Sequence, residues 1–110
     1  EPDAQQAVQI GRLVAHAATL RRMSTGIAGL LERGANPQVE AALVKHVGTG
    51  FEREIPEIAR LLVDAGQQGE AGQRFADALR HVTLAAPSFT LRGGTREILR
   101  GVIARGMGLR

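Results

Sequence analysis

Apolar residues recur through the first third of the chain at steps that alternate between three and four residues. This spacing places them on one side of an α-helix, and it holds for three successive heptads. The row consists of Ile10, Leu13, Ala17, Leu20, Ser24, Ile27 and Leu31, and it is widened by Val14, Ala18 and Ala28. Pro2 precedes the row and Gly34 follows it, as expected at the start and the end of a helix. We therefore predict one long helix over residues 3–33.

The second predicted helix covers residues 37–65. Asn36 is placed to act as its N-cap, with Pro37 as the first helical residue. Helix-weakening residues interrupt its interior at Gly48, Gly50 and Pro56. We expect either one kinked helix or two short ones, with the apolar face continuing across the break.

Two shorter helices are predicted in the rest of the chain. One covers residues 70–85 and is ended by Pro87, and the other covers residues 95–105 with Gly106 as its C-cap. No segment alternates apolar and polar residues as a half-buried strand does. A length of 110 residues is that of one ordinary domain. The predicted fold is all-α: an antiparallel four-helix bundle formed by a single domain over residues 1–110.

The composition removes several classes of function. The chain has no cysteine, which excludes disulfides, thiolate metal sites and cysteine nucleophiles. It has no tryptophan or tyrosine and only three phenylalanines, so it offers little for base stacking. No apolar run reaches the roughly 20 residues of a membrane span, and no secretion signal is visible. We expect a cytoplasmic protein, and a chain that starts at Glu1 instead of methionine is expected to be part of a longer one.

Positive charge is concentrated at the C-terminal end. Residues 80–110 contain six arginines and one acidic residue, whereas residues 1–79 contain eight basic and ten acidic residues. A basic end attracts phosphate groups, on a cofactor or on nucleic acid, unless it is only a solvated helix face. The acidic balance of residues 1–79 and the lack of a recognition motif argue against nucleic-acid binding.

The segment RGGTREILR at residues 92–100 contains the candidate site. Thr95 is a natural N-cap, and Glu97 puts a carboxylate where the helix dipole favours one. Gly93 and Gly94 carry no Cβ, so another group can approach the backbone closely. This pattern is typical of an anion or polar-ring site at a helix start, and it is equally compatible with a plain tight turn.

The longer segment GGTREILRGVIARGMGL, residues 93–109, closely resembles the C-terminal segment of acyl-CoA dehydrogenases. The matching residues are Gly94, Thr95, Glu97, Ile98, Arg100, Ile103, Ala104 and Arg105. The order of helices upstream also resembles the C-terminal helical domain of that family, over nearly all of the chain.

The resemblance implies an FAD-dependent enzyme that converts an acyl-CoA to the trans-2-enoyl-CoA. Thr95 and Glu97 match positions that contact FAD in the family, and Arg96 and Gly94 adjoin them. The position of the usual catalytic glutamate is Gly93, so the resemblance assigns no catalytic residue to this chain.

The residues before this threonine depart from the family pattern in a second way. The position before Gly93, often tyrosine in the family, is Arg92, and we expect these two residues to line the substrate site. The base is then expected on a helix preceding Glu1 or on a partner subunit. A family motif with a glutamine and a glycine pair is only weakly matched, by GQQGEAG at residues 66–72.

The resemblance also implies partners. They are an acyl-CoA substrate, an electron-transfer protein, and further subunits in a homo- or hetero-oligomer, a dimer or tetramer built through the helical bundle. Gly93 leaves a second hypothesis open, in which the chain is a non-catalytic helical subunit or an interaction module of a heteromeric assembly.

Other polar residues give weaker signals. His16, His46 and His81 lie on three different predicted helices, and none has the helical neighbour that a metal pair requires, apart from Asp77 with His81. No metal site is predicted. Ser24 is interpreted as a small packing residue in the apolar row, not as a nucleophile.

Two charged sets complete the candidates. The carboxylates Glu52, Glu54 and Glu57 cluster around Pro56, as general bases if buried and as a solvated face if not. The guanidinium groups of Arg92, Arg96 and Arg100 share a face if the last helix extends backwards, either as phosphate contacts or as a solvated stripe.

Overall fold

The computed structural model describes residues 2–63 and 69–109, and within these residues the only regular elements are four α-helices. They are α1 (Ala4–Glu32), α2 (Gln38–Leu62), α3 (Glu70–Phe89) and α4 (Arg96–Gly106). The predicted all-α class with four helices is therefore confirmed.

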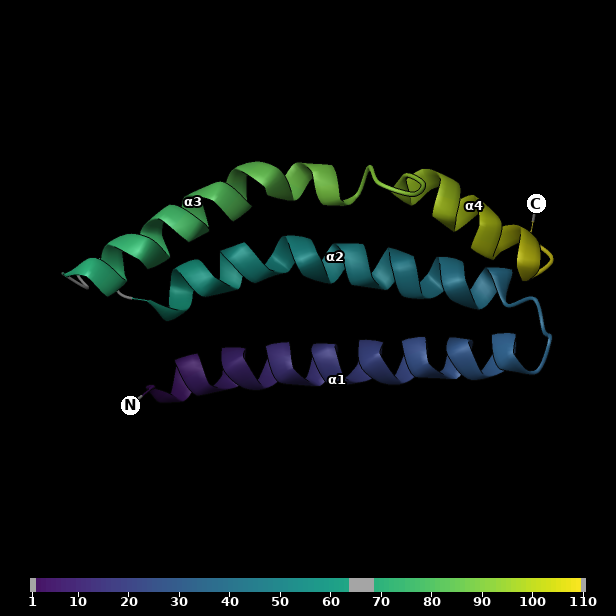
Figure 1. Ribbon diagram of the computed structural model, residues 1–110, viewed down its shortest axis with the longest axis horizontal. Coiled ribbons are helices and arrows are strands. Elements are labelled where there is room, and N and C mark those ends of the chain that lie inside the picture. The colour runs from purple at the N-terminus through teal and green to yellow at the C-terminus, as the bar shows by residue number, and fades with distance from the viewer. Residues whose placement is uncertain (1, 64–68, 110) are drawn as a thin grey trace.

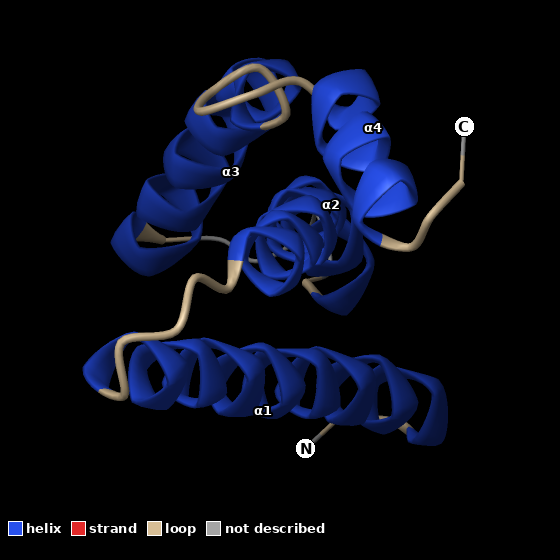
Figure 2. Cartoon of the chain, turned by 90° about the vertical axis from the view of Figure 1, so that its right-hand side faces the viewer, coloured by secondary structure: helices blue, strands red, loops and turns tan. Residues whose placement is uncertain are grey.

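The helix α2 lies at the centre of the molecule. Figure 1 shows α1 along one side of α2, and α3 and α4 one after the other along the opposite side. The view along the long axis in Figure 2 shows the same order, with α2 between α1 and the α3–α4 pair. Among the described residues, α1, α3 and α4 do not bring Cα atoms within 8 Å of one another. The bundle is therefore open and elongated, 52 × 25 × 24 Å, with every helix packed on α2.

Several helix ends follow the sequence signals. At the start of α1, Asp3 Oδ1 accepts a hydrogen bond from the Gln6 amide at 2.7 Å, and Gln6 Oε1 accepts one from the Asp3 amide at 3.0 Å. This reciprocal pair is a capping box. Gly34 follows the end of α1 with φ 75°, and Thr95 caps α4 by accepting from the Ile98 amide at 3.4 Å. These ends match the predictions to within a residue.

Three predicted helix ends were wrong. Pro37, not Asn36, is the N-cap of α2, because its ψ of 56° is not helical. The helix α3 continues past Pro87 to Phe89, and Ala86 in its last turn and its C-cap Thr90 are each only 7% exposed. Gly106 is the last residue inside α4 and Met107 is the cap, because the Met107 amide still donates to the Ile103 carbonyl at 3.0 Å.

The central helix α2 is continuous over 25 residues. It passes through Gly48, Gly50 and Pro56 without dividing, so the predicted alternative of two short helices is wrong. Packing on two sides stabilises it against the weak positions, since Thr49 and Pro56 are both buried. The predicted end at residue 65, like part of the loop at 66–72, lies outside the described residues.

The side of α1 that packs on α2 differs in part from the predicted row. The half-buried positions are Gln6, Gln9, Leu13, His16, Leu20, Met23, Ile27, Gly29 and Leu30. They share Leu13, Leu20 and Ile27 with the prediction, but the other half of the row is exposed: Ile10, Ala17, Ser24 and Leu31. The apolar surface of α1 is wider than one neighbouring helix can cover, and α2 covers only one edge of it. Ser24 is therefore not a packing residue within this chain.

The buried core is thin. Its apolar members are Ala42, Ile58, Ala86 and Leu99, each 7% exposed, and α1 contributes none. Large apolar side chains remain in contact with solvent on every helix, among them Val14 at 62%, Leu84 at 77% and Ile98 at 59%.

Candidate functional site

The start of α4 is set by two glycines in left-handed backbone conformations. Gly93 has φ 63° and Gly94 has φ 109°, values that residues with a side chain adopt only at a cost. They turn the chain from the end of α3 into α4, where Thr95 takes the N-cap position with extended backbone. The predicted glycines are thus required by the turn itself. Gly93 is exposed and Gly94 is half-buried.

Residues of the first turn of α4 form hydrogen bonds with one another. The pKa of Glu97 is lowered, first because its carboxylate accepts a hydrogen bond from its own backbone amide, then because it accepts one from the Thr95 hydroxyl. The positive charges of Arg100 and Arg96 lower it further. A group that binds at this helix start therefore meets a carboxylate beside the exposed amides.

Arg96, the first residue of α4, supplies an unsatisfied donor. Its Nε is buried and has no hydrogen-bond partner among the described residues. Buried guanidinium nitrogens are nearly always paired, so this atom is suited to an acceptor that residues 2–63 and 69–109 do not provide. The side chain lines a groove of about 540 Å³ together with Arg12, Arg53 and Glu54.

The side chain of Lys45, on α2, lies against Gly93. A Cβ atom at Gly93 would lie 2.8 Å from Lys45 Cε and 2.9 Å from Lys45 Nζ. The ammonium group therefore occupies the space into which a side chain at position 93 would extend. Lys45 was not among the site residues predicted from the sequence, although it stands out there as the only lysine.

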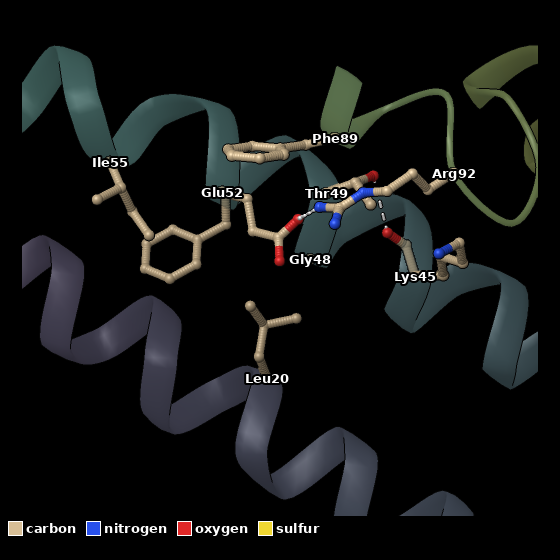
Figure 3. A pocket seen from close by; sticks show the side chains of 9 residues that line it. Leu20, Lys45, Gly48, Thr49, Glu52, Ile55, Phe89 and Arg92 are labelled. Carbon is tan, nitrogen blue, oxygen red and sulfur yellow. Dashed lines mark hydrogen bonds and ion pairs between the residues drawn. The ribbon is translucent and has the colours of Figure 1, made fainter. Parts of the chain in front are cut away.

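Arg92 lies in the turn before α4 and points back toward α2. Its guanidinium carbon is 5.0 Å from the centre of the Phe89 ring, and its Nη2 is 3.7 Å from Glu52 Oε2. Figure 3 shows the ion pair of Arg92 with Glu52, and Lys45 nearby. All three residues line one groove, whose volume is about 590 Å³. Because α4 begins only at Arg96, Arg92 does not continue the helix face of Arg96 and Arg100, and the predicted three-arginine stripe is wrong.

The arginines of α4 act instead on a histidine of α2. The pKa of His46 is lowered, mainly by burial and then by the charges of Arg100 and Arg96. Its Nδ1 is buried without a hydrogen-bond partner among the described residues. The environment therefore favours the neutral imidazole.

The predicted site residues fall into two groups. Gly94, Thr95, Arg96 and Glu97 lie together at one helix start, as expected. The side chain of Arg92 belongs to the groove between α1, α2 and the end of α3, on the other side of the turn.

The three clustered glutamates are all engaged in ion pairs. Glu54 binds Arg12 at 3.4 Å and Glu57 binds Arg60 at 3.0 Å, and all three carboxylates are about half exposed. This exposure agrees with the interpretation of the glutamates as a solvated face and not as buried general bases.

The histidines are equally dispersed. His16 packs edge-on against Phe51 with ring centres 5.3 Å apart, and the Asp77 carboxylate is bound by Arg80 and Gln73. Across the described ranges, no group of histidines and carboxylates has the geometry of a metal site.

The fold and the site define an all-helical domain whose last helix begins at a glycine turn and presents a capped, arginine-bearing first turn. The family model for the acyl-CoA dehydrogenase C-terminal domain matches residues 4–108, and the chain belongs to that family. The match spans all four helices, in agreement with a resemblance over nearly all of the chain. The searches of curated proteins and of solved structures each found no match.

Family membership defines a general class. As full-length enzymes, acyl-CoA dehydrogenases are flavoprotein oxidoreductases of lipid metabolism and typically use FAD. Among the helices described, none combines the length and the apolar character that crossing a membrane requires.

Proposed function

We propose that residues 1–110 form the C-terminal helical domain of an FAD-dependent acyl-CoA dehydrogenase-like subunit, which dehydrogenates an acyl-CoA thioester to the trans-2-enoyl-CoA. The observation that carries this proposal is the start of α4, where Thr95 caps a helix directly after two left-handed glycines within a chain of this family.

The residues at this helix start fit a polar cofactor. The Arg96 Nε is a buried donor without a partner in the described part of the chain, the Thr95 hydroxyl lies in the first turn, and Gly94 keeps the approach free of a Cβ. Bound FAD supplies the acceptor for the hydride that leaves the β-carbon of the acyl group. In this proposal, Gly94, Thr95, Arg96 and Glu97 bind and orient the cofactor, while Arg92 and Gly93 border the substrate.

The catalytic base belongs elsewhere in this proposal. Gly93 has no group that accepts a proton, and the space beside it holds the Lys45 ammonium. The base then lies on another segment of the full-length protein or on a partner subunit.

The outer face of α1 is the proposed subunit contact. On one side of this helix, Ile10, Val14 and Leu31 are 41%, 62% and 58% exposed. Such a face supports assembly into a homo- or hetero-oligomer, a dimer or tetramer, in keeping with a family whose members oligomerise. An electron-transfer partner and a cytoplasmic location remain predictions from the sequence.

The second candidate function is that of a non-catalytic helical subunit in a heteromeric acyl-CoA dehydrogenase. Gly93 with its adjoining ammonium favours it, because this arrangement replaces a proton acceptor by a cation. The two candidates differ in whether the subunit carries flavin and turns over by itself.

The test is the flavin content of the full-length protein, measured by visible absorbance after purification. We expect a yellow protein, and we expect Thr95→Val to lower its flavin content. Thr83→Val is the matched control, since Thr83 is an exposed threonine of α3 whose hydroxyl donates only to the Leu79 carbonyl at 2.7 Å. A full-length protein that never takes up flavin would refute the first candidate, and equal flavin in the two variants would remove the role of Thr95.

A further inference from the structure

The groove between α1, α2 and the end of α3 has the chemistry of a binding site in its own right. We propose that it binds an aliphatic chain that ends in a carboxylate, with the carboxylate at Lys45 and the chain along the apolar wall. The proposal rests in part on the proposed function, since Arg92 lines this groove and is placed there beside the substrate, but its test requires neither flavin nor turnover.

One end of the groove carries a net positive charge. Arg92 and Glu52 compensate each other across 3.7 Å, which leaves Lys45 as the uncompensated charge of the lining. Lys45 is half-buried, and within residues 2–63 and 69–109 its ammonium has no carboxylate within ion-pair distance. A partly buried cation without a counter-charge is suited to an anionic ligand.

The choice of residue supports the same conclusion. Lys45 is the single lysine among 14 basic residues, and its Cε and Nζ lie 2.8 and 2.9 Å from where a Cβ at Gly93 would stand. An ammonium is a compact point charge, whereas a guanidinium is a planar fork suited to bidentate phosphate contacts. The site therefore favours one carboxylate over a phosphate-rich ligand such as a nucleotide.

The rest of the groove is largely apolar. Its walls come from three helices and consist of Leu20, Phe51, Ile55 and Phe89, with Gly48 and Thr49 in the floor. Figure 3 shows Leu20 reaching from α1 on the side opposite Phe89. The Thr49 hydroxyl donates to the Lys45 carbonyl at 2.9 Å, so it adds no free polar group to the floor.

The dimensions agree with a medium-length chain. A volume of about 590 Å³ falls in the range of small-ligand sites. Aliphatic and aromatic walls with one uncompensated cation at one end match an amphiphile whose only charged group is terminal. Two sources have this chemistry: a free fatty acid, and an acyl-CoA whose acyl group ends in a second carboxylate.

The experiment titrates the full-length protein with decanoate and with 1-decanol by isothermal calorimetry. We expect decanoate to bind at least tenfold more tightly than decanol, because only decanoate forms a charge-assisted bond with Lys45. Lys45→Met keeps the length of the side chain and should abolish this preference, while Phe89→Ala should weaken both ligands. Arg80→Met is the control, since Arg80 is an exposed cation on α3 outside the groove.

Two further ligands distinguish the sources. Tighter binding of sebacoyl-CoA than of decanoyl-CoA, lost in Lys45→Met, identifies a dicarboxylic acyl group as the ligand, and equal binding of the two thioesters identifies the free acid. Equal affinity of the unmodified protein for decanoate and decanol, or an unchanged preference in Lys45→Met, overturns the proposal. Because these titrations are read without turnover, their failure leaves the flavin test unaffected.

Discussion

Gly106 tests how closely α4 packs on the start of α2. A Cβ atom at position 106 would overlap Val39 Cγ2 and lie 3.3 Å from both Val39 Cβ and Cγ1. Val39 is β-branched and sits in the first turn of α2, where its χ1 is restricted, so it cannot rotate away at little cost. Gly106→Ala therefore requires the two helices to separate.

The size of the effect follows from two opposing contributions. Overpacking costs about 1–3 kcal/mol. Replacement of glycine by alanine inside a helix returns about 1 kcal/mol. We expect Gly106→Ala to lower the free energy of unfolding by up to about 2 kcal/mol.

Gly101→Ala is the matched control in the same helix. A Cβ atom there would meet only Arg105 Nη1, at 3.8 Å. This variant should therefore gain about 0.5–1 kcal/mol from helix propensity alone.

The assay is urea unfolding of the full-length protein, combined with hydrogen exchange of the peptides that cover α4. Gly106→Ala should exchange faster in α4 than the unmodified protein, and Gly101→Ala more slowly. Adding Val39→Ala to Gly106→Ala should restore part of the protection. If Gly106→Ala is as stable as Gly101→Ala, the close contact between α4 and α2 is not real.

Two further predictions concern charge and assembly. The pKa of His46 is lowered from 6.5, so the unfolded chain binds a proton more readily, and the stability contributed by the neutral imidazole is complete above pH 6.5 and is lost as the pH falls through the folded-state pKa. His46→Leu should therefore flatten the decline of stability on acidification, measured by urea unfolding at a series of pH values, and an unchanged decline would contradict the role of His46. Val14→Arg should shift the oligomer to smaller species in analytical ultracentrifugation, whereas Thr19→Arg, at another exposed position of α1, should not. Equal behaviour of the two variants would place the subunit contact elsewhere.

The helices themselves were predictable because periodicity and end signals act locally. The capping pair of Asp3 and Gln6 and the Thr95 cap depend on residues within one turn. The predicted helix ends at Pro87 and Gly106 were wrong for different reasons. Ala86, in the last turn of α3, is buried by tertiary packing, which no local pattern encodes. At the end of α4 the Met107 amide still donates to the Ile103 carbonyl at 3.0 Å, so the helix includes Gly106.

The site was only partly predictable for the same reason. Thr95, Arg96 and Glu97 are neighbours in sequence, so their arrangement at the start of α4 followed from the helix alone. The approach of Lys45 to Gly93 joins α2 to the turn before α4, and no local pattern encodes it. The row on α1 was misassigned because the apolar surface exceeds the part that α2 covers, and periodicity does not tell which edge faces a neighbour.

The most direct test of the account is a crystal structure of the full-length protein with flavin bound. The account predicts FAD atoms within hydrogen-bond distance of Thr95 or Arg96 at the first turn of α4, with no carboxylate from this chain at the position of Gly93. A flavin seated away from α4, with this helix start covered by apolar side chains, would contradict it.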